Sequence, residues 1–166
     1  MPQHPQVSVV IPNYNHAPYL PQRIESVLNQ TFRDFEVIIL DDKSTDGSVE
    51  IIRRYSGDPR VVEIIVNEEN SGSPFSQWKR GVEKAKGEWV WFAESDDYAE
   101  PDFLERMLSA VAGDNVGLIY CDSMVEGDDK GQAENFSTRK NQRFGTDRWS
   151  RSHENNGVEE IGDFRL

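Results

Sequence analysis

Cysteine and histidine are both scarce in this sequence. Cys121 is the single cysteine among 166 residues, so a disulfide framework and a cysteine-rich zinc site are both excluded. His4, His16 and His153 lie far apart in the sequence, and this spacing argues against a histidine metal cluster. A metal bound by this chain is therefore expected to have oxygen ligands.

Long apolar runs and an excess of basic residues are also missing. No stretch of about 18 apolar residues occurs, so no membrane-spanning helix is predicted. Residues 1–6 are polar and lack the pattern of a secretion signal, so we expect a cytoplasmic protein, which could work at the inner face of the membrane through regions beyond this chain. The net charge is −12, and nucleic acid is therefore not an expected partner.

The glycine-rich loops that commonly hold nucleotide phosphates are absent. No GxGxxG follows the first apolar run, and GxxxxGK[ST] does not occur. A dinucleotide-binding fold and a P-loop are both disfavoured as a result. If the chain binds a diphosphate, a metal ion has to supply the positive charge.

Short apolar runs alternate with helical patterns through the first two-thirds of the chain. The runs predict five strands, at residues 7–11, 35–40, 61–66, 89–93 and 116–120. The helical patterns that separate them have apolar faces formed by Leu20, Ile24, Val27 and Leu28; by Val49, Ile52 and Tyr55 after the capping residue Asp46; by Phe75, Trp78, Val82 and Ala85 after Ser73-Pro74; and by Phe103, Leu104, Met107, Leu108 and Val111 after Pro101. This order predicts an α/β fold, a doubly wound, mostly parallel sheet flanked by helices.

The alternation stops after Cys121. Residues 126–157 are polar, with Phe136, Phe144 and Trp149 as their few apolar anchors. They predict a long loop with a short helix near Trp149. We therefore divide the chain into an α/β domain over 1–125 and a polar, loop-rich region over 126–166.

Polar side chains follow three of the predicted strands. Pro12-Asn13-Tyr14-Asn15 follows the first, Asp41-Asp42 the second and Glu94-Ser95-Asp96-Asp97 the fourth. Ligands of open α/β sheets bind at these carboxyl ends. Paired carboxylates repel each other unless a cation joins them, and Mg²⁺ or Mn²⁺ with substrate phosphates fits such oxygen ligands. An aromatic ring beside a carboxylate acceptor suits a nucleobase.

These motifs, in this order, resemble family 2 glycosyltransferases of the GT-A fold. The resemblance covers residues 7 to about 120 and is carried by VSVVIPNYN, by FEVIILDDKSTDGS, by the Asn70–Gly72 stretch NSG and by KGEWVWFAESDD. It implies a sugar transferase, and it rests on several motifs in sequence order rather than on any one of them alone. The residues 1–125 would form the nucleotide-sugar-binding domain, and 126–166 would begin the acceptor side.

By position, the resemblance implies a role for each residue that follows a strand. Pro12 and Tyr14 would line the base pocket, and Asp42 would accept a hydrogen bond from the base. Asp96 would face the ribose or a metal-bound water, and Asp97 would ligate the Mg²⁺ or Mn²⁺ that bridges the diphosphate. The implied partners are a nucleoside-diphosphate sugar of the UDP, GDP or dTDP type and a saccharide acceptor, on a polysaccharide or a lipid, with inversion at the sugar.

Two features depart from the family pattern. Many relatives carry Ala-Arg-Asn-x-Gly on the helix before the fourth strand, where this chain has Gln77-Trp78-Lys79-Arg80-Gly81. Lys79 or Arg80 could still contact phosphate. The general base of inverting relatives has no recognisable equivalent here, so we expect it beyond Leu166 and expect the fold to be incomplete at its C-terminal end; Glu159-Glu160 is the weaker candidate.

Two alternatives stay open at this point. The chain could bind a nucleoside diphosphate without transferring sugar, because it lacks the general base. It could instead be a phospho-acceptor signalling domain, which also places acids and Mg²⁺ at strand ends. Such a domain needs a lysine after its last strand, whereas Cys121-Asp122-Ser123 stands there.

Overall fold

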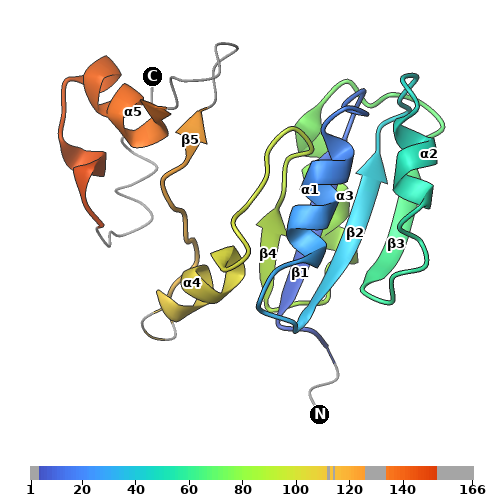
Figure 1. Cartoon of the computed structure of the whole chain (residues 1–166), viewed down its shortest axis with the longest axis horizontal. Helices are drawn as coiled ribbons and strands as arrows, with labels where there is room; N and C mark the ends of the chain where they lie inside the picture. The colour runs from blue at the N-terminus through green and yellow to red at the C-terminus, as the bar shows by residue number, and fades with distance from the viewer. Residues whose placement is uncertain (1–3, 112, 114, 126–133, 153–166) are drawn as a thin grey trace. The chain divides into compact units, whose positions relative to one another are not determined.

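The computed structural model describes residues 4–111, 113, 115–125 and 134–152. Its centre is a sheet of four parallel strands in the order β3-β2-β1-β4. These strands are β1 (Val7–Asn13), β2 (Phe35–Asp41), β3 (Val61–Val66) and β4 (Trp89–Phe92). Figure 1 shows them running in one direction, so that all four carboxyl ends lie at one edge of the sheet.

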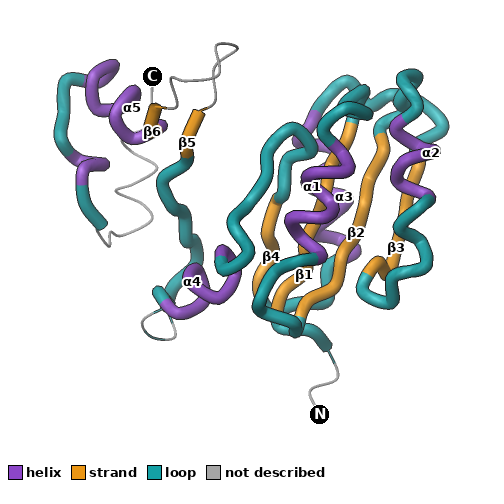
Figure 2. Tube along the Cα trace, in the orientation of Figure 1, coloured by secondary structure: helices purple, strands orange, loops and turns teal. Residues whose placement is uncertain are grey.

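Helices cover both faces of this sheet. α1 (Leu20–Leu28) and α2 (Ser48–Arg53) lie on one face, and α3 (Pro74–Lys84) lies on the other (Figures 1 and 2). Every residue of β1 and β2 is buried as a result. Strands enclosed on both sides need continuous apolar sequences, which explains the runs VSVVI and FEVIIL. The doubly wound α/β architecture predicted from the sequence is confirmed.

α1 has the apolar face that its sequence predicts, with one polar member. Leu20, Ile24 and Val27 are fully buried against the sheet. Arg23 shares that inward face and is also buried, with 3% of its surface exposed. Gln30, two residues after the end of α1, accepts a hydrogen bond through its side-chain oxygen from the Leu104 N–H in the first turn of α4 (Phe103–Ser109), at 2.9 Å.

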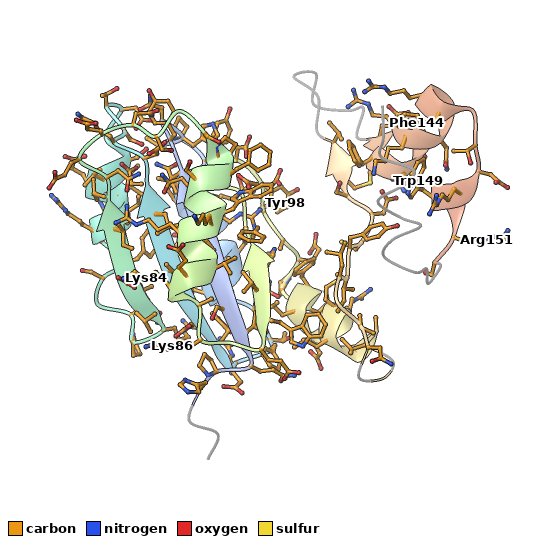
Figure 3. The ribbon with its side chains drawn as sticks, turned by 180° about the vertical axis from the view of Figure 1, so that it is seen from behind. Lys84, Lys86, Tyr98, Phe144, Trp149 and Arg151 are labelled. Carbon is orange, nitrogen blue, oxygen red and sulfur yellow. The ribbon has the colours of Figure 1, made fainter. Side chains whose placement is uncertain are left out.

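The predicted apolar face of α3 is wrong at two positions. Phe75 and Val82 are 68% and 52% exposed, whereas Gln77 and Gly81 are buried. The reason is the close approach of α3 to β1: a Cβ on Gly81 would lie 2.4 Å from Cγ1 of Val10. The face of α3 that contains Gly81 therefore packs against the sheet, and Phe75 and Val82 point toward solvent. In Figure 3, which shows this side of the sheet, Lys84 marks the end of α3 toward the amino ends of the strands.

The predicted fifth strand is also wrong. Residues 116–120 have no regular secondary structure, and Leu118 is 74% exposed. An apolar run forms a strand only when a neighbouring strand can pair with it, and periodicity alone does not reveal that neighbour. The short strands β5 (Met124–Val125) and β6 (Glu134–Asn135) pair antiparallel instead, in a separate two-stranded sheet.

The segment predicted as a long loop contains a helix. α5 (Phe136–Phe144) is followed by a 3-10 turn at Arg148–Ser150, which is the short helix expected near Trp149. The Trp149 ring packs beside Phe144, with ring centroids 5.9 Å apart, and Lys140 lies 4.9 Å from its centre. Residues 126–133 and 153–157 of the predicted loop, and Glu159-Glu160, lie outside the described residues.

The chain forms two compact units, residues 1–106 and 107–166. The parallel sheet and all the residues proposed for the nucleotide site belong to the first unit. The domain boundary that we place after residue 125 stays a prediction. Within the described residues, no helix combines the length and the apolar character needed to cross a membrane.

Candidate functional site

The candidate site lies at the carboxyl edge of the parallel sheet. Asp42 directly follows β2, and Asp97 lies in the turn after β4. These two strands flank β1, whose carboxyl end carries Pro12 and leads to Tyr14. The topology therefore brings all five residues predicted for the site, Asp96 included, to one edge of one sheet.

Hydrogen bonds join the segments that follow β1 and β2. Asn13 donates through Nδ2 to Oδ2 of Asp41 at 2.7 Å, and Asp41 accepts the Ser44 N–H at 2.8 Å. Asn15 accepts the Thr45 N–H at 2.8 Å through its side-chain oxygen. Asp41 is fully buried by these contacts. It holds the loops together, while Asp42 beside it has different partners.

Asp42 is the centre of a buried polar network. Its exposed fraction is 4%, and its Oδ1 accepts hydrogen bonds from Asn67 at 2.6 Å, from the Ser71 N–H at 2.9 Å and from Gln77 at 2.8 Å. Its Oδ2 accepts the Ser71 hydroxyl at 2.8 Å. Arg80 donates to the Asn67 side-chain oxygen. Three donors saturate Oδ1, whereas Oδ2 retains acceptor capacity for a ligand.

Pro12 and Tyr14 differ in their surroundings. Pro12 is buried near the end of β1, while Tyr14 is 49% exposed in the loop that follows the strand. An exposed ring can stack on a base without first leaving a packed core. Asn15, the next residue, has a left-handed backbone with φ of 56°, which asparagine tolerates better than most residues.

The residues after β4 form a turn, which we call the acidic turn and define as Glu94–Asp97. The Asp97 N–H donates to the Glu94 carbonyl at 3.2 Å. Asp96 and Asp97 are exposed, whereas Glu94 is half-buried and accepts the Trp78 indole N–H at 2.8 Å. Burial raises the pKa of Glu94, and the charges of Asp96 and Asp97 act in the same direction.

His16 connects this turn to the loop after β1. Its Nδ1 lies 2.7 Å from the Ser95 hydroxyl, and Ser95 is buried. His16 is half-buried, and its hydrogen bond across the site is not apparent from the sequence. The segments after β1, β2 and β4 are thus linked by side-chain hydrogen bonds into one surface.

The exposed carboxylates fit a hard cation that is shared with phosphate. Among the described residues, no three His, Cys, Asp or Glu side chains gather closely enough to enclose a metal alone. Mg²⁺ and Mn²⁺ commonly take one or two carboxylates and complete their shell with phosphates and water. Asp97, whose side chain is 72% exposed, can provide such a ligand, with Asp96 beside it.

The comparison with known families decides the class of protein. The sequence profile described as glycosyl transferase family 2 matches residues 8–166. The chain belongs to glycosyl transferase family 2. This membership confirms the resemblance seen in the sequence and removes the phospho-acceptor alternative.

Individual relatives match between 61% and 77% of the chain. The poly(ribitol-phosphate) beta-glucosyltransferase of Bacillus spizizenii is 38% identical over 103 residues, which cover 61% of this chain and 16% of that protein. The chain spans 36%, 42% and 41% of the length of three other curated relatives that it matches. It therefore corresponds to less than half of each of these family 2 proteins.

Solved structures share the fold of this family 2 chain. TarS of S. aureus, crystallised with UDP, is 32% identical and has a TM-score of 0.59, over 63% of this chain and 31% of that one. The mannosyltransferase PcManGT of Pyrobaculum calidifontis, in complex with GDP-Man and Mn²⁺, is 26% identical with a TM-score of 0.62, over 70% and 35%. These similarities support the GT-A-type arrangement of sheet and helices.

Several polar residues of the site are not apparent from the sequence. Asn67, Gln77 and Arg23 are each remote in sequence from the carboxylates that they contact. Gln77 falls where the family pattern is lost, so the motif gave no sign of its role. Arg23 did leave a signal, since it is a charged residue on the otherwise apolar inward face of α1.

Proposed function

We propose that this chain binds the nucleoside-diphosphate sugar of a metal-dependent glycosyltransferase, which transfers the sugar to a saccharide acceptor with inversion. The observation that carries the proposal is the shared edge of the sheet. Asp42 and the acidic turn follow strands on either side of β1, and His16 bonds across to Ser95 at 2.7 Å. A nucleotide lying over the end of β1 could contact both sides.

Each site residue then has a chemical task. Tyr14 would stack on the base, against Pro12, and Oδ2 of Asp42 would accept a base N–H. Asp96 would face the ribose or a metal-bound water, and Asp97 would hold the Mg²⁺ or Mn²⁺. When bound, the metal would supply Lewis-acid stabilisation of the charge on the departing diphosphate.

The known ligands of similar structures favour this substrate class. TarS has been crystallised with UDP and with UDP-GlcNAc, and PcManGT with GDP-Man and Mn²⁺. By analogy with the beta-glucosyltransferase that acts on poly(ribitol-phosphate), we propose a cell-envelope polysaccharide or its lipid-linked precursor as acceptor. The exposed free thiol of Cys121 fits a reducing compartment such as the cytoplasm.

Calorimetric titration of UDP, GDP and dTDP with and without Mn²⁺ tests the proposal. We expect one of these nucleotides to bind in the presence of Mn²⁺ and to lose most of its affinity when EDTA removes the metal. Asp97→Asn should cause a similar loss, because it removes the charged oxygen ligand. Asp102→Asn is the matched control, since Asp102 lies just before α4 and pairs there with Arg106 at 2.6 Å.

Two outcomes would contradict the proposal. If no nucleotide binds with Mn²⁺ present, the chain is not a donor-binding domain. If Asp97→Asn and Asp102→Asn bind equally well, Asp97 is not the metal ligand. Release of the nucleoside diphosphate from the sugar donor, measured with the same protein, then separates transfer or donor hydrolysis from binding alone.

A further inference from the structure

Arg23 is a buried cation whose surroundings are unusual for an arginine. Its side chain is 4% exposed, and it lies on the inward face of α1 among Leu20, Ile24 and Val27. Burying a guanidinium costs free energy unless carbonyl and carboxylate groups compensate the charge. The burial of Arg23 therefore requires partners, and the acidic turn provides them.

Arg23 contacts both ends of the acidic turn. Its Nε donates to the backbone carbonyl of Glu94 at 2.7 Å, and its Nη2 lies 3.9 Å from Oδ2 of Asp97. Its guanidinium carbon lies 5.7 Å from the centre of the Trp91 ring on β4. The guanidinium of Arg23 on α1 thus contacts β4 and both the first and the last residue of the acidic turn.

The charges around Arg23 explain why a cation is needed there. Glu94, Asp96 and Asp97 place three carboxyl groups within four residues, and the electrostatic influence of all three reaches Arg23. Burial lowers the pKa of Arg23, while these carboxylates oppose that effect. An arginine stays charged at neutral pH even when its pKa falls. It therefore offsets the repulsion that would otherwise push the carboxylates apart.

The guanidinium also has unused bonding capacity. Its Nη1 is buried and has no hydrogen-bond partner, and the 3.9 Å separation between Nη2 and Asp97 is longer than a hydrogen bond. The contact with Asp97 is therefore loose, so the carboxylate remains available to another cation. The contact with the Glu94 carbonyl is short, so the backbone of the turn is held more firmly than the side chain that it presents.

We propose that Arg23 is a positioning residue. From its buried position it holds the backbone of the acidic turn, so that the Asp97 carboxylate can bind the metal and diphosphate without the turn changing conformation. This inference rests on the proposed function. It assigns to α1 a role in metal-dependent nucleotide binding, in addition to its packing against the sheet. Arg23 itself does not contact the nucleotide.

Arg23→Met and Arg23→Lys test this role, with Mn²⁺ and the nucleoside diphosphate that the wild type binds. Removing a group that orients a metal ligand typically weakens metal-dependent binding about 10- to 100-fold. We expect a loss of this size for Arg23→Met and a smaller loss for Arg23→Lys, which keeps the charge but not the planar fork. Binding of the corresponding nucleoside, which has no phosphate, should change little in either variant.

Arg60→Met is the matched control. Arg60 pairs with Asp58 at 2.7 Å, donates to the Leu28 carbonyl at 2.7 Å and lies 5.4 Å from the Phe35 ring. It repeats the contacts of Arg23 at the amino edge of the same sheet, just before β3. Arg60→Met should therefore leave Mn²⁺-dependent binding at the wild-type level.

The outcomes separate this proposal from the one on which it rests. If the wild type binds no nucleotide with Mn²⁺, the proposed function fails. If the wild type binds and Arg23→Met binds equally well, the positioning role is overturned. An equal loss of nucleoside and nucleotide binding would also overturn it, because that result indicates a general structural effect. If circular dichroism shows Arg23→Met to be unfolded, Arg23→Lys decides, and wild-type binding by that variant refutes the role.

Discussion

Asp42 is a buried carboxylate whose two oxygens have different surroundings. Oδ1 accepts three hydrogen bonds, from Asn67, Ser71 and Gln77, whereas Oδ2 accepts one, from the Ser71 hydroxyl. The crowded oxygen fixes the orientation of the side chain. The other oxygen is therefore held in a constant position, and under the proposed function it is the atom that accepts the base N–H.

Asp42→Asn should reduce both stability and nucleotide affinity. Asparagine replaces one carboxylate oxygen with an NH₂ group. If the NH₂ group takes the place of Oδ1, it faces the donors Asn67, Ser71 and Gln77; if it takes the place of Oδ2, the acceptor proposed for the base N–H is lost. We expect the free energy of unfolding to fall by about 1–3 kcal/mol, as measured by urea denaturation, and nucleoside binding to weaken.

Asp41→Asn is the control for this prediction, because Asp41 is also buried and also accepts two hydrogen bonds, from Asn13 and Ser44. It should lose stability while its nucleoside affinity, corrected for any unfolded protein, stays close to that of the wild type. Equal loss of affinity in the two variants would remove the special role of Asp42.

At the level of elements, the contact of α3 with β1 determines which face of the helix is buried. Gly81 lies so close to the sheet that an added Cβ would be 2.4 Å from Cγ1 and 2.9 Å from Cγ2 of Val10. Val10 is fully buried and β-branched, so its side chain has little freedom to move aside. The helix can approach the sheet this closely only with glycine.

Gly81→Ala should therefore destabilise the protein, although alanine favours helices. We expect the free energy of unfolding to fall by about 1–3 kcal/mol, as for other overpacked cores, and Val10→Ala in the same chain should recover part of the loss. Gly57→Ala is the control, since a Cβ there would meet nothing within 4 Å. An unchanged unfolding midpoint for Gly81→Ala would show that α3 can shift away from β1 at little cost.

The same helix shows how far the sequence predicts the structure. Continuous apolar runs are sufficient to locate β1 and β2, because both of their faces are buried, and the strand ends locate the carboxylates. The spacing of Phe75, Trp78 and Val82 is helical, yet Gln77 and Gly81 face the sheet. The periodicity of apolar residues does not reveal that α3 approaches β1 closely enough to require a glycine at the contact, because that depends on the distance between the two backbones. The partners of Asp42 are unpredictable for a similar reason, since each is remote in sequence.

For the molecule as a whole, the net charge of −12 makes stability depend on which carboxylates have partners. Asp58 has one, because Arg60 donates to it at 3.0 and 2.7 Å. The hydrogen bond from the Arg60 side chain lowers the pKa of Asp58 below its ordinary value of 3.8. The pair therefore stabilises the folded protein while Asp58 is ionised.

Asp58→Asn should remove this contribution and with it part of the pH dependence of stability. Because the folded pKa is lowered, the contribution is present above pH 3.8 and is lost as the pH falls through the folded value. The pair is partly exposed, so the difference from the wild type should be about 1 kcal/mol or less at neutral pH. Urea unfolding from pH 6 downward, on the order of one unit per step, should show the two proteins converging in acid; a constant difference would contradict the prediction.

The order of the sheet has a consequence for how a bound ligand would affect local motion. β1 alone joins β2 and β3 to β4 among the described residues. If β1 separates from either neighbour, Asp42 and Asp97 are no longer held at a fixed distance by one sheet. A nucleotide that contacts both residues would therefore oppose the separation of β1 from its neighbours. Amide protons of this strand would then be the slowest to exchange with solvent in the liganded protein, and their protection would grow with ligand concentration.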